Sequence, residues 1–267
     1  MTAAKFLSHL REGGYSKFSI GLALTSLKWL NSFFPGISGE LEDKFLGRIV
    51  ESAKRNVIST KSQKLPFSKA MIRDMMRVPL SPSLEELRDA LIPSLSFSLL
   101  LRNDELIHLS CRHMTATEKG MTFFIVSSKK DVYRKGKTLY LARQAGEFSV
   151  FDLLLRYMAK AKLGVGENKF LFGKIHKQGA SQIVDGKVSI SYHECLGIVK
   201  RKVKSLGLNA HDYATHSSRS GAATSLASCV TPFELMVSGR WSDPRSLSSY
   251  VEIDADRRYG ISENLFM

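Results

Sequence analysis

The feature that most limits how this 267-residue chain can fold is the contrast between one short β-prone stretch and long segments of helical periodicity. Residues 123–126 and 138–141 are rich in β-branched and aromatic residues and flank a charged turn that contains Gly136. Elsewhere, apolar residues recur at the three- to four-residue spacing of a helix. The clearest such segments are residues 16–34, 41–57, 150–161, 191–206 and 217–227. This contrast predicts a mainly α-helical fold with a small antiparallel β-sheet or hairpin, of the α+β class.

A polar, basic stretch at residues 58–69 divides the chain into two predicted parts. Beyond it, Ser83 followed three residues later by Glu86 predicts the start of a helix, because serine and glutamate at this spacing cap a helix N-terminus. We therefore expect a small helical module over residues 1–64 and a larger domain over residues 65–267.

The net charge points to a polyanionic partner. The chain has 39 lysines and arginines against 25 aspartates and glutamates, a net charge of +14. The surplus is not a tail, because residues 112–143 have a net charge of +6 and residues 160–204 a net charge of +7. Such a surplus suggests either nucleic acid or an anionic membrane face as the partner, and basic side chains spread over folded segments suit a broad DNA-binding surface better than a disordered arm. A solvated basic protein without a nucleic-acid partner is the alternative that charge alone leaves open.

Other features limit the cellular setting and the cofactors. No apolar run is long enough to cross a bilayer, and the N-terminal residues are charged where a secretion signal needs an apolar stretch. We therefore expect an intracellular protein without a membrane partner. Cys111, Cys195 and Cys229 lie far apart and form no Cys-x-x-Cys pair, which predicts partly buried thiols rather than zinc ligands or disulfides. No acidic cluster or P-loop is present, so we expect neither a metal nor another cofactor.

The C-terminal part carries the residues on which the functional interpretation depends. His216 and Arg219 are three positions apart, so on a helix they share one face. Residues 220–223 are small and would let this helix pack tightly against a neighbour. A Gly-Arg-Trp sequence that ends at Trp241 follows, and Tyr250 lies nine positions further on.

Together with an arginine and a lysine earlier in the chain, these residues resemble the active-site set of tyrosine recombinases, the phage-integrase family. Here the set reads Arg102, Lys129, His216, Arg219, Trp241 and Tyr250. Each member alone is more typical of a structural or solvated residue, whereas the joint order and spacing favour an active site. The local sequences HSSRSGAAT and GRWSDPRSLSSYVE look most like recombinases of eukaryotic DIRS, Ngaro and Crypton elements.

The resemblance covers essentially the whole chain, and it implies a fold and a function. It implies the tyrosine recombinase catalytic fold over residues 65–267, preceded by a helical core-binding (SAM-like) DNA-binding module over residues 1–64, which is short for this family. It also implies a site-specific recombinase or integrase that cuts and rejoins double-stranded DNA as a homo-tetramer, without metal or ATP. A eukaryotic host would place the protein in the nucleus.

The chemistry of such an enzyme explains the main residue types. Moving a phosphodiester requires fixed positive charge around a five-coordinate phosphorus. Arg102 and Arg219 would form this clamp, because a planar guanidinium can hold two phosphate oxygens. Tyr250 would attack as its phenolate and keep the DNA 3′-phosphate on its oxygen. Because the phosphotyrosyl bond keeps the energy of the broken bond, rejoining would need no ATP.

The remaining members of the set would support this reaction. Lys129, on the predicted β-turn, would protonate the leaving 5′-oxygen, and the adjacent Lys130 is the alternative donor. His216 would bond the phosphate or assist proton transfer, and Trp241 would contribute its indole N–H and its bulk. Glu105, one helical turn after the first arginine of the set, would orient that guanidinium.

Two other functions remain open at this point. A domesticated DNA-binding protein could keep the site without using it, although an intact set of six residues speaks against decay. A type IB topoisomerase would use similar chemistry to relax DNA, but the HSSRSGAAT and GRW sequences and the small size favour a recombinase.

Overall fold

The computed structural model describes residues 2–33, 44–56, 64–126, 136–178, 181–248 and 250–251. Contacts within the chain divide it into two units, residues 1–62 and 63–267. Each unit has a hydrophobic core of its own. A DNA-binding role for the first unit stays a prediction.

The first unit has three described helices, and each of them packs against the other two. They are α1 (Ala3–Glu12), α2 (Lys17–Phe33) and α3 (Lys44–Asn56). Their buried side chains are Leu7, Ile20, Leu24, Leu46, Ile49 and Val50. The sequence predicted α2 and α3 but not α1, which begins where the Thr2 side chain accepts a hydrogen bond from the Lys5 N–H at 3.4 Å. The chain leaves α1 through two glycines, and Gly14 adopts a φ of +71°.

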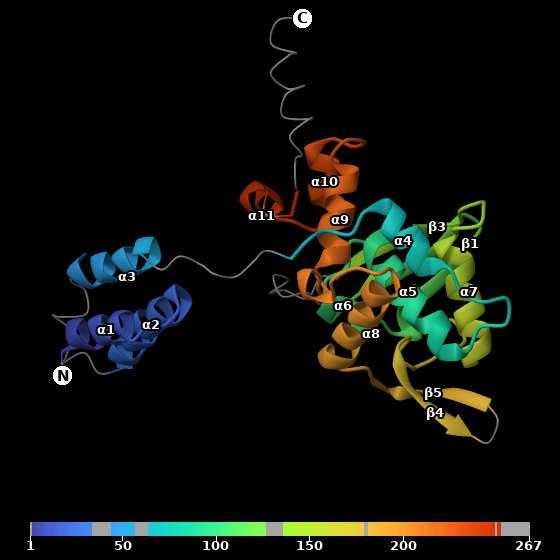
Figure 1. The fold of residues 1–267 in the computed structure, drawn as a ribbon, viewed down its shortest axis with the longest axis horizontal. Coiled ribbons are helices and arrows are strands. Elements are labelled where there is room, and N and C mark those ends of the chain that lie inside the picture. The colour runs from blue at the N-terminus through green and yellow to red at the C-terminus, as the bar shows by residue number, and fades with distance from the viewer. Residues whose placement is uncertain are drawn as a thin grey trace, which may run out of the picture. The chain divides into compact units, whose positions relative to one another are not determined.

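The second unit is mainly helical. Its helices are α4 (Lys69–Met76), α5 (Leu84–Ser98), α6 (Asn103–Ile107), α7 (Val150–Ala161), α8 (Tyr192–Ser205), α9 (Ser217–Leu226), α10 (Pro232–Gly239) and α11 (Pro244–Ser248), with short 3₁₀ turns η2 (Cys111–His113) and η3 (Ala210–Asp212). Helix α5 contacts α4, α7, α8 and α9 and lies at the centre of this unit (Figure 1). The start predicted for α5 is confirmed, because the Ser83 and Glu86 side chains cap each other's N–H groups at 3.1 and 2.7 Å.

Two small antiparallel sheets complete the second unit. One has the strand order β1 (Met114–Thr117), β2 (Gly120–Ile125) and β3 (Lys137–Ala142), and the other is a hairpin of β4 (Gly173–Gln178) and β5 (Ser181–Ser189). The predicted hairpin corresponds to β2 and β3, where Phe123 pairs with Leu139. The sequence did not predict β1, β4 or β5, which hold few strongly β-prone residues and form through pairing with a neighbour. The predicted class, mainly α-helical with small antiparallel sheets, is confirmed.

Helix α9 packs closely against the segment that enters the second unit, as its small residues predicted. A Cβ atom at Gly221 would collide with the backbone of Phe67. The Phe67 N–H donates to the Ser217 carbonyl at 3.0 Å, which fixes the segment along the start of α9. This packing sets the position of the helix that carries Arg219.

Among the described residues, no helix has both the length and the apolar character needed to cross a membrane. Cys111 and Cys195 are buried, and burial raises the pKa of their thiols to about 11 and about 12. The prediction of a partly buried thiol was wrong for Cys229, which lies exposed in the turn after α9.

Replacement of Gly221 tests the close packing of α9. Gly221→Ala is expected to lower the free energy of unfolding by about 1–3 kcal/mol, because the added methyl group overlaps a backbone that cannot move away freely. Gly197→Ala in α8 is the matched control, since the nearest atom to its Cβ is the Arg201 Nη1 at 3.7 Å. There, alanine should stabilise the helix by about 0.5–1 kcal/mol. Urea unfolding measures both variants, and a stabilising Gly221→Ala would contradict the packing.

Candidate active site

Arg219 is the most deeply buried charged residue described in the structure, with an exposed fraction of 0%. One of its Nη atoms donates to the Leu100 carbonyl after α5, and the other donates to the Gly239 carbonyl at the end of α10. Its guanidinium carbon lies 4.4 Å from the centre of the Trp241 ring. A buried guanidinium needs such partners, because a buried charge is costly unless it is hydrogen-bonded.

Tyr250 and Trp241 lie on the same guanidinium. The Tyr250 ring centre is 5.4 Å from the Arg219 guanidinium carbon and 5.3 Å from the Trp241 ring centre. The Tyr250 carbonyl accepts a hydrogen bond from the Thr224 hydroxyl at 3.2 Å, which ties this part of the chain to α9. Gly239 makes room for the indole, since a Cβ there would collide with the Trp241 ring. Three of the six predicted residues are therefore in direct contact.

Arg102 stands at the N-terminus of α6 and pairs with Glu105. The Arg102 backbone N–H donates to the Glu105 Oε2 at 2.9 Å, and its Nη1 donates to the Oε1 at 2.8 Å. The Glu105 side chain is 1% exposed, whereas the Arg102 side chain is 20% exposed. Glu105 thus holds a guanidinium whose remaining surface faces solvent.

Sequence reasoning missed Arg240, which is as well connected as any of the predicted residues. Its Nη2 donates to the Glu105 Oε2 at 2.6 Å and to the Leu100 carbonyl at 2.9 Å. Its Nη1 donates to the carbonyls of Leu99 and Ser238 at 3.3 and 3.2 Å. The side chain is 6% exposed. The only signal in the sequence was its place between a glycine and Trp241, which says nothing about burial.

The clustering of these charges shifts several pKa values. Burial raises the pKa of Glu105, but the Arg240 and Arg102 charges outweigh this and hold it below its usual value. Burial, together with the Arg102 and Arg240 charges, lowers the pKa of Arg219 to about 10, so this side chain stays charged at pH 7. Burial also lowers the pKa of Arg240.

The structure places His216 beside this cluster and leaves the two lysines undescribed. His216 is exposed overall and precedes α9, yet partial desolvation of its ring and the charges of Arg219 and Arg102 lower its pKa. Its imidazole is therefore neutral at pH 7. Lys129 and Lys130 lie outside the described residues, which stop at 126 and resume at 136.

The cluster contains hydrogen-bond donors that could bind an anion. The buried Nε atoms of Arg219 and Arg240 and the indole Nε1 of Trp241 have no hydrogen-bond partner among the described residues. Buried donors are almost always satisfied, so the unpaired donors of Arg219 and Trp241, which lie against each other, suggest a ligand. Among the described residues, no group of three or more His, Cys, Asp or Glu could hold a metal ion.

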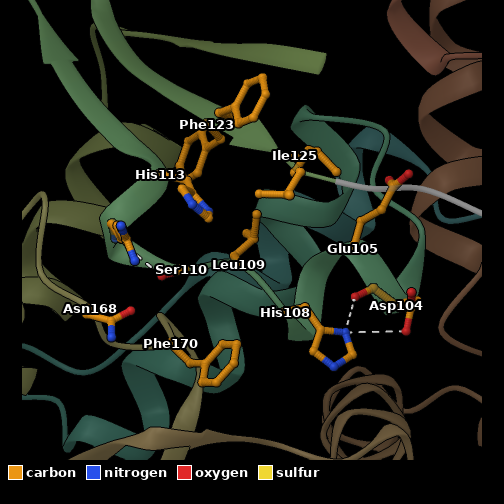
Figure 2. A pocket seen from close by; sticks show the side chains of 13 residues that line it. Asp104, Glu105, His108, Leu109, Ser110, His113, Phe123, Ile125, Asn168 and Phe170 are labelled. Atoms are coloured by element: carbon orange, nitrogen blue, oxygen red, sulfur yellow. Dashed lines mark hydrogen bonds and ion pairs between the residues drawn. The ribbon is translucent and has the colours of Figure 1, made fainter. Parts of the chain in front are cut away.

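A cavity of about 490 Å³ lies beside α6, and Figure 2 shows the side chains that line it. Asp104 and Glu105 of α6 and His108, directly after it, form one side, while Phe123 and His113 lie opposite. The His108 Nδ1 lies 2.8 Å from the Asp104 carbonyl oxygen and 3.3 Å from the Asp104 Oδ1. Because Glu105 lines the cavity and also bonds the arginines, the cavity and the cluster share a wall.

Comparison with known proteins shows which folds this chain resembles. No family model matches the chain. An integrase/recombinase XerD homologue of Selenomonas ruminantium is 28% identical over 172 residues, which cover 63% of this chain and 48% of that relative. The chain thus spans about half the length of the curated relative that it matches.

Solved structures resemble nearly the whole chain. The XerH site-specific recombinase, bound to a palindromic difH substrate, is 17% identical with a TM-score of 0.64 and matches 98% of this chain and 72% of its own. The Tn1549 transposon integrase in complex with circular intermediate DNA is 16% identical with a TM-score of 0.63, and the match covers 98% of this chain and 84% of the integrase. A lambda integrase dimer bound to a core site is 14% identical with a TM-score of 0.60 and coverages of 94% and 80%. The predicted tyrosine recombinase fold is confirmed.

The shared carboxylate predicts a pH-dependent stability. The pKa of Glu105 is lower in the folded state than in the unfolded state. Its contribution to folding stability is therefore complete above the unfolded-state pKa of about 4.3 and is lost as the pH falls through the folded-state pKa. Glu105→Gln is expected to lower the free energy of unfolding by about 3 kcal/mol at pH 7, because it breaks a buried ion pair. The difference from wild type should shrink towards pH 3.

Urea unfolding at pH 7, 5 and 3 measures this difference. The control is Glu118→Gln, in the exposed turn between β1 and β2, which should change stability by less than about 0.5 kcal/mol. A difference for Glu105→Gln that is the same at all three pH values would show that its carboxylate charge does not stabilise the fold.

Proposed function

We propose that this protein is a site-specific DNA recombinase of the tyrosine recombinase family, which cuts and rejoins double-stranded DNA through a 3′-phosphotyrosyl intermediate. The observation that carries the proposal is the meeting of Arg102, Arg219, Trp241 and Tyr250, which are up to 148 positions apart in the sequence, with His216 beside them. A nucleophile, two guanidiniums and a neutral imidazole at one place suit phosphoryl transfer.

In the proposed reaction, Arg102 and Arg219 hold the non-bridging oxygens of the scissile phosphate. Arg102 has an exposed edge for this purpose, but Arg219 is fully buried beneath the Tyr250 and Trp241 rings. The Tyr250 ring must therefore move off the guanidinium before a phosphate can reach it. This movement frees the phenol to face the phosphorus and exposes the unpaired Nε of Arg219.

The proton and bond changes balance without another reactant. The Tyr250 hydroxyl gives its proton to the neutral His216 imidazole, and the phenolate oxygen forms a bond to phosphorus. The bond from phosphorus to the 5′-oxygen breaks, and Lys129 or Lys130 protonates that oxygen. Attack by a 5′-hydroxyl of another strand reverses these steps and releases Tyr250.

The comparisons support DNA as the substrate. The curated relative is named an integrase/recombinase, and the XerH, Tn1549 and lambda structures are complexes of those proteins with DNA. We extend this to a tetramer that acts on double-stranded DNA inside the cell, since exchange by alternating strand cuts needs four active sites. The local resemblance to DIRS, Ngaro and Crypton recombinases further suggests a mobile element of a eukaryotic nucleus.

The two alternatives predict different products. A DNA-binding protein that no longer uses its site would form no covalent adduct. A type IB topoisomerase would relax supercoiled DNA as a single subunit without exchanging strands between duplexes. The likeness to an integrase/recombinase over 172 residues favours strand exchange.

The nucleophile can be tested with a pool of nicked suicide duplexes that carry a randomised core. Wild-type protein is expected to form an SDS-resistant adduct on a subset of the pool, because loss of the short fragment past the nick prevents rejoining. Tyr250→Phe should form none, since it lacks the attacking oxygen, while its DNA binding should stay within about twofold. Gel electrophoresis and sequencing of the captured strands measure both, and an adduct in Tyr250→Phe would exclude this nucleophile.

Chelation tests whether the guanidiniums supply the positive charge. Adduct formation on the enriched duplex is expected to keep its wild-type rate in 10-fold more EDTA than any divalent metal present, because Arg102 and Arg219 replace metal charge at the phosphate. Single-turnover cleavage with and without EDTA measures this. A loss of tenfold or more that added Mg²⁺ restores would refute the metal-free mechanism.

A further inference from the structure

We propose that Arg240 is a positioning residue, which fixes the Arg102 guanidinium through Glu105 and joins it to Arg219 through the Leu100 carbonyl. The inference rests on the proposed function, because positioning matters only if Arg102 and Arg219 hold a phosphate. Arg240 itself does not touch the DNA in this proposal.

The Glu105 carboxylate is the first link. Its Oε1 accepts from Arg102, and its Oε2 accepts from both the Arg102 backbone N–H and the Arg240 Nη2. The carboxylate is 1% exposed, so its orientation is determined by these partners. Without Arg240, one oxygen would keep only the backbone N–H, and the carboxylate could rotate together with the Arg102 side chain.

The Leu100 carbonyl is the second link. It accepts from Arg219 and from the Arg240 Nη2, so two guanidiniums from different elements meet at one oxygen. The Arg102 Nη2 in turn donates to the Arg240 carbonyl at 3.3 Å. The three arginines are therefore connected through a single network, in which Arg240 is the member that contacts both of the others' partners.

Backbone geometry supports a functional reason for this network. Only three non-glycine residues among those described have a positive φ, and two of them are Leu100 at +46° and Arg240 at +58°. The left-handed region costs energy for such residues, and strained residues concentrate at functional sites. Here the two strained residues bond each other through the Arg240 side chain and the Leu100 carbonyl.

Arginine suits this position better than lysine. Arg240 donates to four acceptors, namely Leu99, Leu100, Glu105 and Ser238, in different directions. A lysine ammonium is a compact charge that could keep the Glu105 contact but not all four bonds at once. Arg240→Lys therefore keeps the positive charge but loses some of the hydrogen bonds that fix the geometry.

The test uses the full-length protein and a duplex enriched from the randomised pool by wild-type protein. On this duplex, Arg240→Lys and Arg240→Gln are expected to slow single-turnover cleavage at saturating protein by tenfold or more. Their dissociation constants, measured by fluorescence anisotropy, should stay within twofold of wild type. This separation is expected because the clamp is misplaced for the reaction while the rest of the DNA-binding surface is intact.

Arg88→Gln is the matched control for lost stability. Arg88 is a largely buried arginine of the same unit, with 12% of its side chain exposed, and it pairs with Asp89 at 2.9 Å. A cleavage loss in Arg240→Lys that Arg88→Gln reproduces at the same melting temperature would overturn the proposal. So would cleavage within twofold of wild type in both Arg240 variants.

A double variant tests whether Arg240 acts through Glu105. In Glu105→Gln/Arg240→Gln, the loss of cleavage rate should be smaller than the product of the two single losses, because both changes release the same guanidinium. Losses that multiply would exclude action through Glu105. If wild-type protein captures no duplex at all, the proposed function fails, whereas normal wild-type capture with unaffected Arg240 variants defeats only the positioning role.

Discussion

The arrangement of the candidate site depends on how one buried guanidinium is kept charged. Arg219 has no exposed surface, and its partners are two backbone carbonyls and two aromatic faces rather than a carboxylate. Burial and the nearby charges of Arg102 and Arg240 lower its pKa to about 10, yet these partners keep it charged at pH 7. The two carbonyls end different helices, so α5 and α10 must both end at the right residue for Arg219 to be stable.

This requirement explains the local architecture. Leu100 and Arg240 adopt positive φ values immediately after α5 and α10, and each turn directs a carbonyl or a side chain towards the arginines. Gly239 is small enough to let the indole of Trp241 close over the guanidinium. The close packing of α9 against the segment that contains Phe67 then fixes the position of Arg219. Helix packing, backbone strain and charge thus all act on the position of the Arg219 guanidinium.

The sequence predicted the parts of this architecture that leave a local pattern. Helical periodicity and the Ser83–Glu86 cap located most of the larger helices, and the small residues after Arg219 indicated close packing. The left-handed turns at Leu100 and Arg240 were not predictable, because neither residue favours that conformation. Burial of Arg240 was missed for a related reason: three of its four acceptors are the backbone carbonyls of Leu99, Leu100 and Ser238, which carry no residue signature.

The net charge of the proposed site explains which state of a phosphodiester it would stabilise. Arg102, Arg219 and Arg240 contribute three positive charges, Glu105 contributes one negative charge, and the lowered pKa of His216 keeps its imidazole neutral at pH 7. A surplus of two positive charges remains before the reaction, and His216 adds a third when it takes the Tyr250 proton. A phosphodiester carries one negative charge, whereas the five-coordinate phosphorus formed when a phenolate attacks carries two. The proposed site therefore matches the transition state better than the bound DNA, and this difference is what accelerates a reaction.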